Sequence, residues 1–194
     1  KAYTGQTSGM HTFYVRGRDL SGNMTSPISA TWTVDSVLPT TPLITSNISG
    51  ATISGTLYTK MTSASLSFSS TDAGSGVASY QCSIDSGTYS ECTSPKSLSA
   101  LAAGSHTLQV RATDNATNLS VAGSYAWNGD LTLPSKPTGL ATTATSSSQI
   151  NLSWNASTDN SAVTGYKVYR GGVLLATLGN VLTLSDVEEI YEPE

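Results

Sequence analysis

Charged residues, cysteines and aromatic side chains are scarce in this chain of 194 residues, and it has no long hydrophobic run. Lys, Arg, Asp and Glu supply only 22 residues, and the nine basic ones are scattered, whereas binding to nucleic-acid phosphates needs clustered Lys and Arg. No apolar run approaches the ~18 residues of a membrane-spanning helix, and no segment of about ten residues has apolar positions at helical spacing. We therefore expect no nucleic-acid binding, no membrane insertion and little helix.

Hydroxyl side chains dominate the composition instead. Ser and Thr make up 60 residues, and Thr, Val, Ile and Tyr recur in short runs separated by Gly, Asn and Asp. Such runs are typical of β-strands whose solvent faces carry hydroxyls rather than charges. The sequence therefore predicts an all-β fold.

An internal repeat sets the scale of this fold. Residues 1–42 align with residues 96–137 without a gap, at a fixed offset of 95. The matched positions include His11 with His106, Val15-Arg16 with Val110-Arg111, Asp19 with Asp114, Asn23 with Asn118, Trp32 with Trp127, Asp35 with Asp130, and Leu38-Pro39 with Leu133-Pro134. A period near 95 residues is about the length of one β-sandwich domain.

Two family resemblances follow from particular runs of residues. The middle of the chain carries Tyr80–Asp85, Cys92, Gly104–Thr107 and Val110–Asp114, and it resembles the bacterial immunoglobulin-like repeats of large surface proteins. The run Pro137–Leu178, with Leu152-Ser153-Trp154 and Tyr166–Arg170, resembles the first half of the fibronectin type III repeats of bacterial secreted proteins. The resemblances imply tandem immunoglobulin-like and fibronectin type III-like β-sandwiches, located outside the cell or on the bacterial cell surface.

We expect three parts along the chain. Residues 1–37 should be the C-terminal strands of a partial immunoglobulin-like repeat, and residues 38–132 one complete immunoglobulin-like domain. Residues 133–194 should form a partial fibronectin type III-like domain that lacks its last strands, where the chain stops. The two open ends raise the hypothesis that residues 1–35 of one molecule complete residues 134–194 of another by strand exchange.

The two cysteines, Cys82 and Cys92, lie within one predicted hairpin. If they form a disulfide, the short loop adds about 2–3 kcal/mol and indicates an oxidising compartment. The alternative is a pair of reduced, buried thiols.

Nothing in the sequence predicts catalysis, and we expect the chain not to be an enzyme. His11 and His106 share one repeat position, which favours a structural role, with the ring packed on a turn and one nitrogen bonded to backbone. Trp32, Trp127 and Trp154 are expected in the core rather than on a sugar-stacking platform.

Acidic and amide side chains are expected to meet at one pole of each sandwich, because linker and loops converge there. The first predicted cluster comprises Asp35, Asp72, Asp114 and Asn118, and the second comprises Asp130 and Asp159. Oxygen-rich clusters suit Ca²⁺, and calcium at the junctions of some adhesins built from similar repeats is what the resemblance implies. The alternative is that these side chains only stabilise their own turns by bonding nearby backbone. No other cofactor is expected.

Three functions fit these expectations. The first is a non-catalytic stalk or adhesive array of a bacterial surface or secreted protein, with neighbouring repeats as partners and a host surface or glycan left unidentified. The second is a carbohydrate-binding or spacer module of a secreted polysaccharide hydrolase. The third is the subunit of a filament that assembles head to tail by the strand exchange described above.

Overall fold

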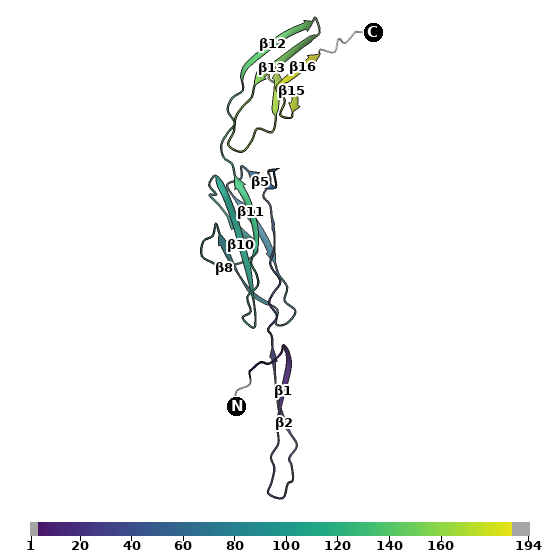
Figure 1. Ribbon diagram of the computed structural model, residues 1–194, viewed down its shortest axis with the longest axis vertical. Coiled ribbons are helices and arrows are strands. Elements are labelled where there is room, and N and C mark those ends of the chain that lie inside the picture. Colours follow the sequence, from purple (N-terminus) through teal and green to yellow (C-terminus); the bar gives the residue numbers. More distant parts are fainter. Residues whose placement is uncertain (1–3, 188–194) are drawn as a thin grey trace, which may run out of the picture. The chain divides into compact units, whose positions relative to one another are not determined.

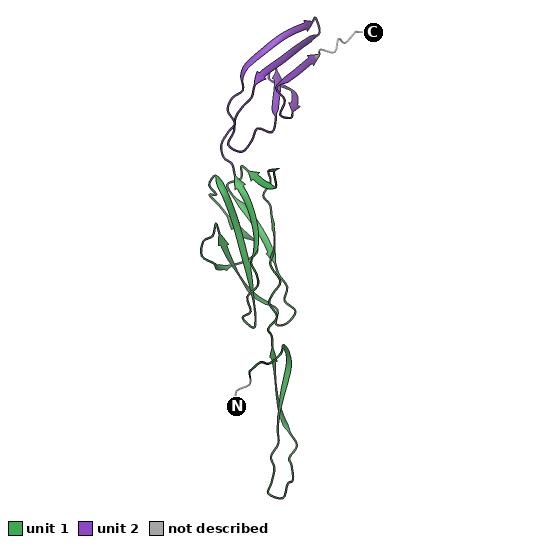
Figure 2. Cartoon of the chain, in the orientation of Figure 1, with its two compact units in different colours: residues 1–129 green, residues 130–194 purple. Residues whose placement is uncertain are grey.

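The computed structural model describes residues 4–187, and all regular elements in that range are β-strands, which confirms the predicted all-β class. The chain divides into two compact units, residues 1–129 and residues 130–194 (Figure 2). This division lies three residues before the predicted boundary after residue 132, while the predicted boundary after residue 37 falls inside the first unit and stays a prediction. Within the described range, no helix is long and apolar enough to cross a membrane.

The first two strands form a sheet of their own. β1 (Gly9–Val15) and β2 (Ile28–Val34) pair antiparallel along their whole length (Figure 1). The Trp32 ring stacks on the Phe13 ring at 4.8 Å between centroids, but both faces of this hairpin keep large exposed side chains. In the described part of the chain, this sheet has no third strand.

A two-sheet sandwich follows within the same unit. The larger sheet has the order β4-β5-β11-β10-β7-β8 and contains β4 (Ala51–Ile53), β5 (Thr56–Thr59), β7 (Val77–Ile84), β8 (Ser90–Cys92), β10 (Gly104–Asp114) and β11 (Gly123–Gly129). The smaller sheet has the order β3-β6-β9 and contains β3 (Leu43–Ser46), β6 (Ala64–Ser69) and β9 (Lys96–Leu98). All paired neighbours are antiparallel except β11 and β5, and this two-sheet order is that of an immunoglobulin-like sandwich.

The N-terminal segment of the sandwich, residues 43–53, is divided between the two sheets. β3 pairs with β6 in the smaller sheet, whereas β4 pairs with β5 in the larger one. The strands β5, β8 and β9 contain only three or four residues each, which is too short for a clear alternation of apolar and polar positions. Their pairing depends on the neighbouring strands rather than on their own pattern.

The core of this sandwich comes from alternate residues of facing strands. Leu66 and Phe68 of β6 face Leu108 and Val110 of β10, and the Trp127 side chain, 2% exposed, lies among them. Alternation arises because successive side chains of a strand point to opposite faces. Burying each such side chain stabilises the fold by about 1.5–3 kcal/mol.

Unit 2 has two small sheets of its own. The first has the order β12-β13-β16, formed by β12 (Thr138–Ser146), β13 (Gln149–Asn155) and β16 (Thr183–Val187). The second pairs β14 (Tyr166–Arg170) with β15 (Val173–Leu178). The buried rings of Trp154 and Tyr166 meet edge to face between these sheets, at 5.5 Å between centroids.

The tryptophan prediction is confirmed for Trp127 and Trp154, which are 2% and 8% exposed. Trp32 is only partly buried, because the hairpin that carries it has no facing sheet in the described residues.

Candidate functional site

The two cysteines form a disulfide, as predicted. Cys82 of β7 and Cys92 of β8 are 5.8 Å apart between Cα atoms, and the bond ties the edge strand β8 to its neighbour. Cys82 is 5% exposed and belongs to the apolar core. The disulfide therefore belongs to the structural framework of the sandwich.

Three of the predicted acidic residues come together at one pole of the sandwich. Carboxylate oxygens of Asp35, Asp72 and Asp114 lie within 4.8 Å of one another. Asp35 follows β2 in the linker, Asp72 lies in the loop between β6 and β7, and Asp114 ends β10. Segments far apart in the sequence thus supply one cluster, which we call the pole cluster.

The linker residue of this cluster is held closely by the loop. Asp35 accepts hydrogen bonds from the N–H groups of Val37 at 3.0 Å and Ser75 at 2.6 Å. Hydrogen bonding from Ser75, and then from Val37, holds the pKa of Asp35 below its usual value. A side chain on Gly74 would collide with the Asp35 carboxylate and would displace it from its present position.

Backbone donors also engage the other two carboxylates. One oxygen of Asp72 accepts two N–H groups of its own loop, at 2.8 and 2.9 Å. Asp114 accepts the N–H groups of Ala116 at 2.9 Å and Asn118 at 2.7 Å. The second oxygen of Asp72, Oδ1, is buried and has no hydrogen-bond partner among residues 4–187.

Asn118, the fourth predicted member, contributes a nitrogen rather than an oxygen. Its side-chain amide donates to Asp114 at 2.7 Å and to the backbone carbonyls of Asp35 at 3.1 Å and Val37 at 3.3 Å. In this arrangement Asn118 ties the β10–β11 turn to the linker. Sequence reasoning expected an oxygen ligand and did not foresee this contact.

The donor set of the pole cluster fits a hard cation in kind. Calcium takes six to eight oxygen ligands, and a carboxylate offers about four lone-pair sites, so each of these groups retains acceptor capacity beyond its N–H donors. The unpartnered Oδ1 of Asp72 would be the first atom to gain from a cation. Calcium binding by these residues stays a prediction.

Asp130 and Asp159 of unit 2 meet through a serine. The Ser161 hydroxyl contacts Asp130 Oδ2 and lies 2.8 Å from Asp159 Oδ1. One hydroxyl carries one proton, so it donates to only one of these carboxylates at a time. Hydrogen bonding from Ser161, and then from the N–H of Thr132, lowers the pKa of Asp130, while Asp159 Oδ2 is buried without a partner.

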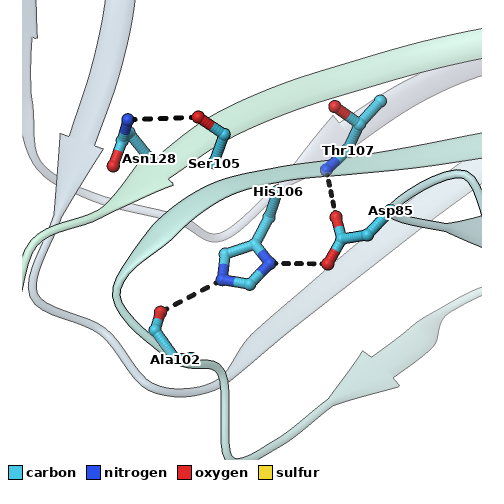
Figure 3. Close-up of polar contacts among 6 residues, drawn as sticks. All are labelled: Asp85, Ala102, Ser105, His106, Thr107 and Asn128. Atoms are coloured by element: carbon cyan, nitrogen blue, oxygen red, sulfur yellow. Dashed lines mark hydrogen bonds and ion pairs between the residues drawn. The ribbon is translucent and has the colours of Figure 1, made fainter.

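A second polar site surrounds His106 on β10. Its Nδ1 lies 2.8 Å from Asp85 Oδ2 and its Nε2 lies 3.1 Å from the Ala102 carbonyl oxygen (Figure 3). The buried residue also packs its ring against that of Trp127, at 5.5 Å between centroids. Asp85 also accepts the N–H of Thr107 at 2.8 Å. Both neighbours of the ring are acceptors, so only the protonated imidazolium satisfies both with N–H donors.

The electrostatics of this pair follow from the geometry. Burial opposes the charged form of His106, but hydrogen bonds to Asp85 and to the Ala102 carbonyl outweigh it and raise the pKa of His106. Burial would likewise raise the pKa of Asp85, and the hydrogen bonds from His106 and Thr107 lower it below its usual value. The pair is thus an ion pair between a strand and the β7–β8 turn at mildly acidic pH.

The backbone contact predicted for both histidines is present. His11 Nε2 lies 2.8 Å from the carbonyl of Thr7, four residues earlier, as His106 Nε2 bonds to Ala102, and each ring lies against the tryptophan of the next strand. The carboxylate partner of His106, Asp85, was not predicted from the sequence. Aspartate is common in turns, so its presence there gave no sign of a histidine contact.

An apolar groove of about 680 Å³ lies in unit 2, with Leu140, Leu152, Trp154 and Tyr169 among its lining. Beside it, β14 pairs with β15 on one edge only, within the described part of this unit. The strand-exchange hypothesis would place a partner strand here, and it stays a prediction.

Comparison with protein-family models gives no match. Sequence relatives include chitinases, exoglucanases and an alpha-amylase. Chitinase A1 of Niallia circulans is 45% identical over 97 residues, covering 45% of this chain and 14% of the chitinase. Exoglucanase B of Cellulomonas fimi is 34% identical over 192 residues, covering 87% of this chain and 16% of that enzyme. The chain therefore spans only a small part of each relative's length.

Among solved structures, titin domains superpose on 93% of this chain and 64% of theirs, at 13% identity and a TM-score of 0.43. At that score the superposition carries no argument.

Proposed function

We propose that this chain is a non-catalytic spacer module of an extracellular bacterial enzyme that degrades insoluble polysaccharides. The observation that carries the proposal is the alignment of 87% of the chain with 16% of an exoglucanase, together with a 45% identical match to part of a chitinase. A segment that recurs as a small part of enzymes with different named activities is better explained as an accessory module than as a catalytic domain.

The chemistry of the pole cluster supports a non-catalytic role. Hydrolysis of a glycosidic bond commonly uses two carboxyl groups, one of which acts as a general acid with a raised pKa. Asp35 has a lowered pKa, and backbone N–H groups hold it, Asp72 and Asp114 in place. Such carboxylates are suited to fixing a loop.

The disulfide supports an extracellular location. Disulfides persist in oxidising compartments, and insoluble polysaccharides are too large to be taken into a cell before they are cut. An accessory module of such an enzyme would therefore work outside the cell.

The tryptophans favour a spacer over a carbohydrate-binding module. Sugar rings stack on exposed aromatic faces, but Trp127 and Trp154 are buried, and Trp32 is stacked on Phe13 and His11. We expect weak or no retention of the chain on insoluble polysaccharides.

Two assays on the purified chain test this proposal. It should release no soluble sugar from chitin or cellulose, and it should remain in the supernatant when either polymer is sedimented. Sugar release would contradict the non-catalytic role, and co-sedimentation would replace the spacer with a binding module.

A chimera tests the spacer role directly. Chitinase A1 should be compared with one variant that lacks its matching region and another in which this chain replaces it. We expect the deletion to lower activity on insoluble chitin, this chain to restore it, and a soluble substrate to be cut equally by all three. Equal activity of all three on insoluble chitin would contradict the proposal.

A surface stalk and an enzyme spacer differ only in the functional domain that the repeats carry. The domain encoded beside the repeats in the same reading frame decides between the two functions. The filament hypothesis needs the groove of unit 2 and the exposed apolar residues of the β1–β2 hairpin to meet in different molecules. It predicts a mass that rises with concentration in light scattering, and a constant monomer mass would contradict it.

A further inference from the structure

Each unit contains a sandwich and the linker that leads into it. The two sandwiches hold these linkers in the same way, although they are of different types. The linkers have one pattern, Asp-x-x-Leu-Pro-Thr/Ser-x-Pro, at residues 35–42 and 130–137. The loops that receive them share Ser-Thr-Asp, at residues 70–72 and 157–159. These loops come from the chain before β7 in unit 1 and before β14 in unit 2.

The central contact is a reciprocal pair of hydrogen bonds. In unit 1 the N–H of Thr40 donates to the carbonyl of Thr71 at 2.8 Å, and the N–H of Thr71 donates to the Thr40 hydroxyl at 2.9 Å. In unit 2 the N–H of Ser135 donates to the carbonyl of Thr158 at 2.8 Å, and the N–H of Thr158 donates to the Ser135 hydroxyl at 2.8 Å.

A tyrosine supports each loop from the following strand. The N–H of Ser70 donates to the Tyr80 hydroxyl, and the N–H of Ser157 donates to the Tyr166 hydroxyl, both at 3.0 Å. Because each tyrosine lies on a strand of its own sandwich, the loop that binds the linker is fixed to the domain that follows that linker.

The first linker residue makes the remaining shared contacts. Asp35 and Asp130 each accept the N–H two residues later, and each accepts a hydrogen bond from the loop serine that follows the shared Asp. In unit 1 that donor is the N–H of Ser75, three residues after the shared Asp, and in unit 2 it is the hydroxyl of Ser161, two residues after it.

The shared contacts do not depend on the last hairpin of a sandwich. Asn118 of the β10–β11 turn also grips the linker in unit 1, whereas the described part of unit 2 holds no counterpart of that hairpin. The loop and its tyrosine are therefore common to both joints, and the amide of Asn118 is an addition.

We propose that the loop before β7 in unit 1 and the loop before β14 in unit 2 are receptors for any preceding linker of this pattern. One joint then connects immunoglobulin-like and fibronectin-like repeats interchangeably, and each linker is folded as part of the domain that follows it. The inference holds whether the repeats serve an enzyme or a surface protein.

Exchanging the two linkers in the full chain tests the proposal. Residues 35–42 and 130–137 have equal length and should be swapped, and a second variant should carry eight Gly and Ser residues in place of 130–137. The readout is amide hydrogen exchange at positions 71 and 158 and at the sixth linker position. We expect the swap to preserve slow exchange and the Gly-Ser linker to accelerate it at position 158 by about tenfold or more.

A matched pair of point variants tests the joint without replacing the linker. Ser135→Thr keeps the hydroxyl that Thr40 supplies in unit 1, and Ser135→Ala removes it. The Thr158 amide should exchange about fivefold faster in Ser135→Ala and unchanged in Ser135→Thr, because one net hydrogen bond is lost. Equal exchange in the two variants, slow exchange with the Gly-Ser linker, or loss of protection after the swap would each overturn the proposal.

Discussion

The hairpins β1–β2 and β10–β11 are two copies of one sequence pattern with different fates. Both pair antiparallel in the same register, so that His11 faces Trp32 as His106 faces Trp127. Val110 is fully buried, whereas its counterpart Val15 is 62% exposed. The difference lies in the neighbours, because β10 pairs with β7 and faces the smaller sheet.

Their turns show the same contrast between local and distant contacts. Asn23 donates its backbone N–H and its side-chain amide to Asp19, both at 2.8 Å, and Asn118 does the same to Asp114 at 2.7 Å. Of the two turn aspartates, Asp19 and Asp114, only Asp114 belongs to a cluster of carboxylates among the described residues. Contacts between residues four apart therefore form the turn in both copies. The pole cluster forms only where the sandwich brings other segments close to that turn.

Loosening the sheet that holds β10 should have the largest effect. Replacing Cys82 and Cys92 by Ala should destabilise the sandwich by about 2–3 kcal/mol, because the unfolded chain gains the freedom of an open loop. Native-state hydrogen exchange of the β10 amides measures this. Amides of unit 2 serve as the internal control, and unchanged β10 exchange would show that the bond adds no stability.

The matched valines test the burial difference directly. Val110→Ala should destabilise the sandwich by about 2 kcal/mol through lost burial and a small cavity, and Val15→Ala by less than about 0.5 kcal/mol. Urea titration with the same exchange readout compares them. Equal losses would mean that the first hairpin is also packed in solution.

Calcium tests whether the pole cluster does more than fix the linker. If it binds Ca²⁺, a concentration ten times Kd should stabilise the sandwich by about 1.4 kcal/mol, measured as a rise in Tm. Asp72→Asn should abolish the rise, and Asp19→Asn in the first hairpin should leave it intact. An unchanged Tm with EDTA and with added Ca²⁺ would remove the hypothesis.

The smallest effect is expected from pH. The raised pKa of His106 means that its stabilising contribution is complete below the unfolded pKa, about 6.5, and is lost as pH rises through the higher folded value. The lowered pKa of Asp85 gives the opposite dependence, with loss as pH falls below about 4. Stability should therefore decline as pH rises above about 6.5.

His106→Gln should flatten that decline, because it removes the contact between the ring and the Asp85 carboxylate. His11→Gln is the matched control, since among the described residues its ring bonds to a backbone carbonyl. Urea titrations at several pH values measure both. A decline that persists in His106→Gln would assign it to another group.

Much of the fold followed from particular residues in the sequence. The short runs of Thr, Val, Ile and Tyr predicted strands, and the 95-residue repeat predicted a unit the size of one sandwich. The place of Cys82 and Cys92 within one predicted hairpin pointed to the disulfide. The parallel pairing of β5 with β11 was not predictable, because a strand of four residues carries too little pattern to choose a partner.

The candidate sites divide in the same way. Convergence of Asp35, Asp72 and Asp114 was expected from the places of their loops in a sandwich, and the structure brings them together. Two contacts were not expected. Asn118 donates its side-chain N–H to the linker instead of offering an oxygen, and Asp85 pairs with His106. Both contacts depend on which atoms of distant segments come within bonding distance.

The sequence by itself determined what depends on neighbours a few residues apart: strand alternation, the Asp-Asn turns, and the histidine that reaches back four residues. The tertiary structure alone decided which copy of the hairpin is buried, which carboxylates meet, and that two different sandwiches grip their linkers through the same contacts. The physical reason is range, because hydrogen bonds and packing act only between atoms in contact, and the fold alone brings distant segments into contact.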